Sequence, residues 1–249
     1  MKKTAIITGS ATGVGAACAK LMTAQGYDVL INYNKSKDEA EQTAAACREL
    51  GGEPILVQGD VADDAACRAM VKAALDAWGR LDVLVNNAGM TAFLGRDKWD
   101  EIDRETFGRI FDVNLVGSFQ MVRAAEAALK ASNGSVVNVS SIAGSLGVGS
   151  SVPYIASKGA LNSLTLHLAR ELAPEIRVNA VCPGLITSRW FADGVGEDNY
   201  QKIKAGYEKS VPLKRASTPE DVADAVVWLA GAAPTVTGEL ILLDGGKHL

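Results

Sequence analysis

The sequence predicts an α/β protein: a doubly wound, mostly parallel sheet of about seven strands with helices on both faces. Short apolar segments alternate with helical patterns from one end of the chain to the other. Within segment 82–86 the apolar residues are continuous, which is typical of a strand covered on both faces. The chain shows no linker, low-complexity tract or internal repeat. Residues 1–249 are therefore expected to form one domain.

Glycines mark the ends of two predicted helices, since Gly51-Gly52 and Gly79 are helix stop signals. The predicted strands span residues 4–8, 28–33, 55–58, 82–86, 135–140, 177–181 and 239–243. The predicted helices span residues 14–26, 38–50, 63–78, 104–111, 115–130, 153–172 and 219–229. Residues 186–212 form one long irregular stretch, expected to be the substrate loop, because stretches of this length are usually lids, binding loops or disordered segments.

Composition excludes several classes of function. The formal net charge of −4 is spread without long runs of one sign, which argues against a nucleic-acid surface. No stretch approaches the roughly 20 apolar residues that cross a membrane, and the apolar run after Lys3 is too short for a signal peptide. The cysteines form no C-x-x-C pair and there are two histidines, so no metal site is expected. Free thiols favour a reducing, cytoplasmic setting.

The first predicted strand runs into a glycine-rich turn, Thr8–Gly15, and then into a helix. Glycines here would let the backbone turn tightly and approach a pyrophosphate at the positive end of the helix. The spacing is G-x-x-x-G-x-G rather than G-x-G-x-x-G. Taken alone, the turn fits a purely structural role as well. Its place at the first strand–helix junction favours dinucleotide binding.

A second constellation consists of Ser141, Tyr154 and Lys158. Tyr154 and Lys158 are four residues apart in a helical pattern, so their side chains share one face. A nearby ammonium would favour the phenolate and lower the pKa of Tyr154 from about 10, which would make the tyrosine a usable acid/base. Ser141 follows the fifth strand, at the edge where open α/β sheets bind ligands. A Y-x-x-x-K pair by itself also occurs by chance on solvated helices.

These residues belong to a longer series of motifs that covers nearly the whole chain in order. With these motifs the chain resembles the short-chain dehydrogenase/reductase family, of the kind that includes 3-oxoacyl-carrier-protein reductases. The resemblance implies a Rossmann-type fold and an oxidoreductase that moves a hydride between a nicotinamide cofactor and a carbonyl/alcohol pair. The motifs are TGSATGVG (8–15), GDV (59–61), NNAG (86–89), Asn114, VNVSS (137–141), YIASK (154–158), PGLIT (183–187) and LDGG (243–246).

The resemblance also implies roles for individual residues. Tyr154 gives or takes the proton, and Ser141, rather than Ser140, hydrogen-bonds the substrate oxygen. Lys158 binds the nicotinamide ribose and lowers the pKa of Tyr154, and Asn114 holds a water that connects to Lys158. The remaining positions implied in cofactor binding are Gly9, Ser10, Thr12, Gly13, Val14 and Gly15 of the turn, Asp60 and Val61 beside the adenine, Asn87 and Gly89 beside the adenosine, and Pro183, Gly184, Ile186 and Thr187 near the nicotinamide or the phosphates.

The end of the second strand bears on the choice between NAD(H) and NADP(H). NAD enzymes place Asp or Glu there to bind the ribose 2′-hydroxyl. This chain has Tyr33, Asn34, Lys35 and Ser36, and it has no acid. A neutral-to-basic segment suits a 2′-phosphate, although Thr12 replaces the basic residue that often precedes the second glycine. The sequence therefore favours NADP(H).

The sequence does not identify the small-molecule substrate. Trp190 and Phe191 follow the PGLIT motif and could cover an apolar or aromatic carbonyl compound, or could simply anchor the loop to the core. Enzymes that act on acyl carrier protein usually present arginines near the active-site mouth. Here Lys130 and Glu175 make a poor docking surface, so 3-oxoacyl-carrier-protein reductase remains an alternative.

Two other classes of function are weaker alternatives. A non-catalytic dinucleotide sensor would not need serine, tyrosine and lysine together, and a sugar-nucleotide epimerase would usually carry a larger C-terminal region. Relatives assemble as tetramers, so the resemblance predicts a homotetramer built through 115–130, 153–172 and 239–243. The apolar strand 239–243 would also fit a buried central position.

Overall fold

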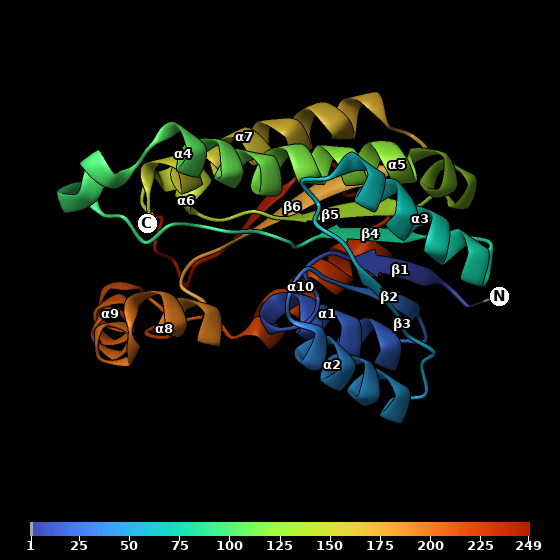
Figure 1. The fold of residues 1–249 in the computed structure, drawn as a ribbon, viewed down its shortest axis with the longest axis horizontal. Helices are drawn as coiled ribbons and strands as arrows, with labels where there is room; N and C mark the ends of the chain where they lie inside the picture. Colours follow the sequence, from blue (N-terminus) through green and yellow to red (C-terminus); the bar gives the residue numbers. More distant parts are fainter. Residues whose placement is uncertain (1) are drawn as a thin grey trace.

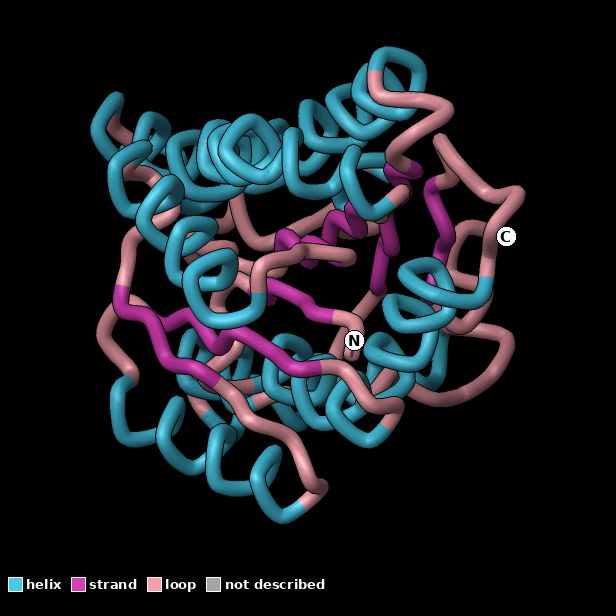
Figure 2. The backbone as a smooth tube through the Cα atoms, turned by 90° about the vertical axis from the view of Figure 1, so that its right-hand side faces the viewer, coloured by secondary structure: helices cyan, strands magenta, loops and turns pink. Residues whose placement is uncertain are grey.

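The computed structural model describes residues 2–249 and contains one sheet of seven parallel strands between two layers of helices (Figures 1 and 2). The strand order is β3-β2-β1-β4-β5-β6-β7, which is the order of a doubly wound sheet and confirms the predicted fold class. The strands are β1 (Thr4–Ile7), β2 (Asp28–Tyr33), β3 (Ile55–Gln58), β4 (Val83–Asn86), β5 (Ser135–Val139), β6 (Arg177–Pro183) and β7 (Leu240–Leu243).

The helices divide between the two faces of the sheet. In Figure 1, α3, α4, α5 and α7 cover the upper face, and α1, α2 and α10 cover the lower face. The helices are α1 (Gly13–Ala24), α2 (Lys37–Glu49), α3 (Asp64–Trp78), α4 (Arg104–Phe111), α5 (Gly117–Ser132), α6 (Ala143–Leu146), α7 (Val152–Glu171), α8 (Arg189–Val195), α9 (Glu197–Ser210) and α10 (Pro219–Val227).

The core consists of two apolar clusters, one on each face of the sheet. Neighbouring strand residues belong to opposite clusters: Ile6 packs with the α3–α5 side and Ile7 with the α1–α10 side, and both are fully buried. A strand covered on both faces needs apolar residues in succession rather than in alternation. This requirement explains the continuous apolar segments of the sequence.

The segment predicted as an irregular loop, 186–212, is mostly helical, so that prediction is wrong. It forms α8 and α9, joined at Gly196, whose φ of +81° lies in a region that favours glycine. Tyr200, Ile203 and Tyr207 recur at the spacing of a helical face, a periodicity that is typical of a helix such as α9. In Figure 1 both helices lie at the end of the molecule where the strands terminate.

The predicted helices 104–111 and 115–130 are parts of one continuous helical run. A π-helical turn, Asp112–Val116, joins α4 to α5 without a break. Such turns insert one extra residue and are frequent at functional sites. This turn directs the Asn114 side chain into the interior, where the residue is 1% exposed. Within residues 2–249 no helix has the length and apolar character to cross a membrane.

Candidate active site

The predicted site residues gather at the carboxyl edge of the sheet, because all seven strands run in the same direction. β1 leads into the glycine turn, β4 into Asn87, β5 into Ser141 and β6 into Gly184. The neighbours β1 and β4 lie at the point where the strand order reverses. In open α/β sheets, ligands bind in the crevice outside this point.

The glycine turn between β1 and α1 is held from beneath by amide side chains. Asn87 Nδ2 donates to the carbonyl oxygens of Thr8 and Gly9, each at 2.9 Å, and Asn32 Oδ1 accepts from Gly9 N at 2.9 Å. Gly9 and Gly13 have φ of +60° and +57°, and a Cβ on Gly15 would lie 2.5 Å from Asn87 Nδ2. The turn therefore requires glycine for its conformation and for its close packing.

The N-terminus of α1 fits a pyrophosphate. Among the described residues, no side chain caps this end of the helix and no acid occupies its first turn. A Cβ on Gly13 would project into open space. Free backbone N–H groups and the positive end of the helix dipole attract phosphate oxygens here. The Ser10 side chain is fully buried, and its hydroxyl donates to Ile7 O at 2.7 Å.

The end of β2 carries a polar network that the sequence did not reveal. Asn34 Nδ2 donates to Asp60 Oδ2 at 3.1 Å, and Arg109 of α4 pairs with the same carboxylate. Burial tends to raise the pKa of Asp60, but hydrogen bonds from Ala62 N and Arg109 outweigh it and hold the pKa below its usual value. An acid from the β3–α3 connection therefore does reach Asn34. Its charge is paired with an arginine.

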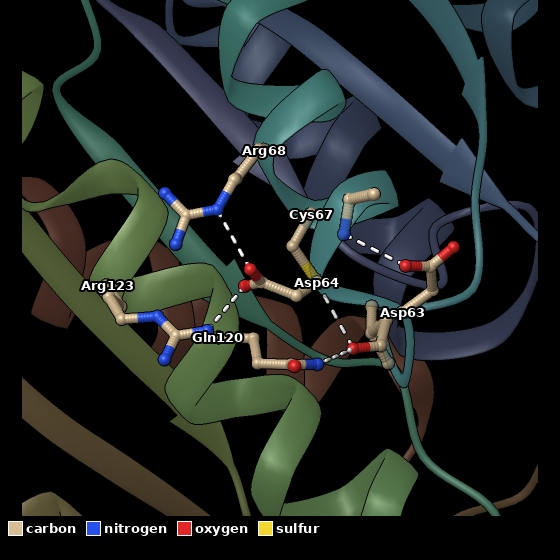
Figure 3. Close-up of polar contacts among 8 residues, drawn as sticks. Asp63, Asp64, Cys67, Arg68, Gln120 and Arg123 are labelled. Carbon is tan, nitrogen blue, oxygen red and sulfur yellow. Dashed lines mark hydrogen bonds and ion pairs between the residues drawn. The ribbon is translucent and has the colours of Figure 1, made fainter.

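The main chain at Val61, implied beside the adenine, is held by Cys67 of α3 and Gln120 of α5, both of which are labelled in Figure 3. Gln120 Nε2 donates to Val61 O at 2.8 Å, and Cys67 Sγ lies 3.2 Å from the same oxygen. A Cβ on Gly117 would lie 2.7 Å from Val61 Cγ2, so α5 approaches closely. These contacts fix the position of the Asp60–Val61 segment.

Ser141 and Tyr154 lie side by side. Ser141 Oγ accepts from Ala143 N at 3.1 Å and donates to Pro183 O at 3.5 Å, and Ser141 and Tyr154 line the same pocket. Tyr154 stands in the first turn of α7, which begins with Val152 and Pro153; proline suits a helix start because its missing N–H has no partner there. The prediction that Ser141, rather than Ser140, accompanies the tyrosine agrees with this geometry, since Ser140 Oγ donates to Asn162 Oδ1 at 2.6 Å.

Lys158 lies one turn after Tyr154, as the spacing predicted, and is 4% exposed. Its Nζ donates to Val139 O at 2.8 Å and lies 5.8 Å from the centroid of the Tyr154 ring. Burial lowers the pKa of Lys158 to about 8. Burial also raises the pKa of Tyr154 above its usual value, and the hydrogen bond with Ser141 offsets only part of this rise. The expected lowering of the tyrosine pKa by lysine is therefore not found, because desolvation dominates.

Asn114 joins the same cluster from the π-helical turn. Its Oδ1 accepts from Met90 N at 2.8 Å, and its Nδ2 donates to Met90 O and to Ser157 Oγ, each at 3.0 Å. Gly89 lies between Asn114 and Lys158: a Cβ there would be 3.4 Å from Asn114 Oδ1 and 3.7 Å from Lys158 Nζ. The structure thus brings Ser141, Tyr154, Lys158 and Asn114 together.

An apolar pocket of about 550 Å³ opens above Ser141 and Tyr154. Pro183, Gly184 and Ile186, at the end of β6 and just after it, line the pocket, and α8 contributes Trp190 and Phe191. Sequence reasoning missed residues of two other walls. They are Phe93 in the β4–α4 connection and Ile142 and Val148 after β5, and no local pattern distinguishes them from loop residues.

Comparison with known proteins accounts for this arrangement. The family profile described as "Enoyl-(Acyl carrier protein) reductase" matches residues 9–248. The chain belongs to the short-chain dehydrogenase/reductase family. A crystal structure described as a short-chain dehydrogenase/reductase of Burkholderia xenovorans superimposes with a TM-score of 0.92 at 40% identity, covering 99% of this chain and 98% of the other.

Curated members of the family are similar over their full length. A protein of Streptomyces violaceoruber named as ketoacyl reductase 2 of the granaticin polyketide synthase is 42% identical, covering 98% of this chain and 96% of that protein. The 3-oxoacyl-[acyl-carrier-protein] reductase FabG of Staphylococcus aureus is 34% identical over 100% and 99%. Glucose 1-dehydrogenase 2 of Bacillus subtilis is 35% identical over 99% and 95%. As a family member the chain is an oxidoreductase that uses a nicotinamide dinucleotide.

Proposed function

We propose that this protein is an NADP(H)-dependent ketoreductase that interconverts a carbonyl compound and a secondary alcohol, with Tyr154 as the acid/base. The observation that carries the proposal is that Ser141 and Tyr154 line the same apolar pocket, with Lys158 one helical turn after the tyrosine. When bound, the nicotinamide supplies the hydride. A carbonyl oxygen that accepts hydrogen bonds from Ser141 and Tyr154 would be polarised and oriented for attack.

The proton chemistry favours carbonyl reduction. Burial raises the pKa of Tyr154, so the phenol keeps its proton at neutral pH. In reduction, the carbonyl carbon gains the hydride, and the Tyr154 hydroxyl gives its proton to the carbonyl oxygen. The tyrosinate that forms lies on the same helical face as Lys158, whose ammonium then favours the charged state. Oxidation of the alcohol requires the reverse proton transfer.

The dinucleotide would extend along the carboxyl edge of the sheet. Its pyrophosphate fits the turn formed by Gly9, Thr12, Gly13, Val14 and Gly15, beside Asn87. The Asp60–Val61 segment and Gly89 would contact the adenosine end. Lys158 would hold the nicotinamide ribose, and Pro183, Gly184, Ile186 and Thr187 would contact the nicotinamide end.

The preference for NADP(H) rests on the residues after β2. Tyr33 is half-buried, Asn34, Lys35 and Ser36 are exposed, and within residues 2–249 neither Lys35 nor Lys37 forms a salt bridge. Unpaired lysines attract a 2′-phosphate. The carboxylate that accepts from Asn34 belongs to Asp60, and Arg109 neutralises it.

Reduction of a carrier-bound 3-oxoacyl group is the second candidate, because two relatives are named for ketoacyl or 3-oxoacyl reduction. An acyl chain would suit the apolar pocket. A non-catalytic dinucleotide sensor is disfavoured because Ser141, Tyr154 and Lys158 are brought together. We further infer a cytoplasmic homotetramer, which acts on a small molecule and does not bind nucleic acid.

Tyr154→Phe tests the proposed chemistry. The variant keeps the ring and loses the proton, so kcat for ketone reduction with NADPH should fall by about 10² to 10⁴ while the fold and NADPH binding remain. Tyr27→Phe, at the opposite end of the molecule, is the matched control and should keep wild-type kcat. A Tyr154→Phe enzyme that retains more than about a tenth of wild-type kcat would contradict the assignment.

A further inference from the structure

The pocket above Tyr154 is mostly apolar. Ser141 and Tyr154 line it, and most of the surface that the other lining residues present is aromatic or aliphatic. Among residues 2–249, Lys247 is the one charged side chain that lines it, and Lys247 Nζ donates to Ser210 Oγ at 3.1 Å. Away from this exposed lysine, a carboxylate held against the apolar walls would lose its hydration without gaining a partner. The walls therefore suit an uncharged substrate body with one carbonyl group.

Phe93 is the wall residue that connects two separate parts of the chain. Its ring contacts Trp190 and Phe191 of α8, with centroid separations of 5.8 Å and 5.5 Å, and the Phe191 contact is edge-to-face at 82°. These geometries are favourable for aromatic pairs. Phe93 thus closes the pocket between the β4–α4 connection and α8.

The backbone that carries Phe93 is anchored. Thr91 Oγ1 and Ser150 Oγ are 2.6 Å apart, and Leu94 N donates to Ser150 O at 3.1 Å. The connection therefore gives the ring little freedom to move away from α8. The helix accommodates the ring with a glycine, because a Cβ placed on Gly194 would overlap the Phe93 ring.

We infer that the substrates of this enzyme are uncharged ketones with a bulky apolar or aromatic body, and that Phe93, seated on Gly194, sets the upper size limit. This inference rests on the proposed ketoreductase function. Part of the 550 Å³ lies beside Pro183, Gly184 and Ile186, where the nicotinamide is proposed to bind. Phe93 lines the remaining space.

Three neutral ketones of increasing size test the class: cyclohexanone, 2-tetralone and fluorenone, each with NADPH. In the wild type, kcat/KM should rise at least about 10-fold from cyclohexanone to 2-tetralone, because more apolar surface is buried, and should fall for fluorenone. In Phe93→Ala the ratio of kcat/KM for fluorenone to that for 2-tetralone should rise by about 10-fold or more. An unchanged ratio overturns the role of Phe93.

A double-mutant cycle tests the contact itself. Gly194→Ala should push the Phe93 ring into the pocket and lower kcat/KM for 2-tetralone by about 10-fold or more. The same substitution should have little effect in the Phe93→Ala background, where no ring is displaced. Gly206→Ala in α9 is the matched control, since a Cβ there meets nothing within 4 Å. Equal losses from Gly194→Ala in both backgrounds overturn the inference.

A binding measurement separates this inference from the proposed function. Calorimetry of 2-tetralone binding in the presence of NADP⁺, which allows no turnover, should show that Gly194→Ala weakens binding only where Phe93 is present. The circular dichroism spectra of all variants should match that of the wild type. Binding with this pattern but no reduction of any ketone contradicts the proposed function alone. Reduction of all three ketones at equal kcat/KM contradicts this inference alone.

Discussion

At the scale of single residues, Lys158 combines a functional position with an energetic cost. Its ammonium is buried with Val139 O as its hydrogen-bond acceptor, and burial lowers its pKa to about 8. The folded protein therefore binds fewer protons than the unfolded chain between about pH 8 and pH 10.5. Lys158 thus destabilises the fold below pH 8, and this penalty decreases as the pH rises through that window.

Lys158→Met should stabilise the fold and lower both NADPH affinity and kcat. At pH 7 the variant removes a buried charge whose penalty is up to about 3 kcal/mol, but it also loses one hydrogen bond. We expect unfolding free energy to increase by about 1–3 kcal/mol at pH 7, with a smaller gain near pH 10. Urea unfolding at both pH values measures this, and NADPH affinity and kcat should fall in parallel. A variant less stable than the wild type at pH 7 would show that the lysine stabilises the fold.

At the scale of elements, the residues at the carboxyl ends of the strands determine which form of the dinucleotide can bind. β2 ends at Tyr33, where a dinucleotide would present its adenosine ribose, and Asn34 follows within hydrogen-bond distance of Asp60. β3 precedes Asp60, and α4 brings Arg109 to it. The charge of this corner is therefore set by three elements, and the basic residues beyond it determine the expected preference for a 2′-phosphate.

Tyr33→Asp should reverse that preference. The new carboxylate would repel a 2′-phosphate and could accept hydrogen bonds from a 2′-hydroxyl, so kcat/KM for NADPH relative to NADH should fall by about 10-fold or more. Tyr33→Asn is the matched control, because it removes the ring without adding charge. The interpretation of the β2 end is wrong if kcat/KM of the wild-type enzyme for NADH equals or exceeds its kcat/KM for NADPH.

At the scale of the whole molecule, apolar surface remains uncovered in the single chain. β7 is an edge strand, so its apolar residues 240–243 are half-buried and not central. This placement removes the alternative that the strand is apolar because it lies inside the sheet. Val116 at the end of the π-helical turn and Phe119 on α5 are 39% and 41% exposed, and Val152 at the start of α7 is 42% exposed. Such surface favours association with further copies.

Light scattering should therefore give a mass about four times 26.0 kDa at micromolar concentration. Phe119→Arg should reduce this mass, because it places a charge where α5 is expected to meet a second copy. Leu50→Arg is the matched control, since Leu50 is 47% exposed at the end of α2, outside the proposed interfaces. A wild-type mass near 26 kDa would refute the tetramer.

The sequence alone determined the features that depend on local pattern. Alternation of apolar and helical segments predicted the sheet, and the four-residue spacing of Tyr154 and Lys158 predicted a shared helical face. The helix α9 is also encoded locally, by the spacing of Tyr200, Ile203 and Tyr207. In each case the information lies within a few residues of chain.

Only the tertiary structure decided the features that depend on distant segments. Phe93 meets Gly194 across about a hundred residues, and no pattern near either position indicates the contact. The direction of the Tyr154 pKa depends on burial by surrounding elements, so the charge of the neighbouring lysine was not a sufficient guide. The physical reason is the same in both cases: desolvation and side-chain packing are properties of the assembled fold, whereas periodicity is a property of the chain.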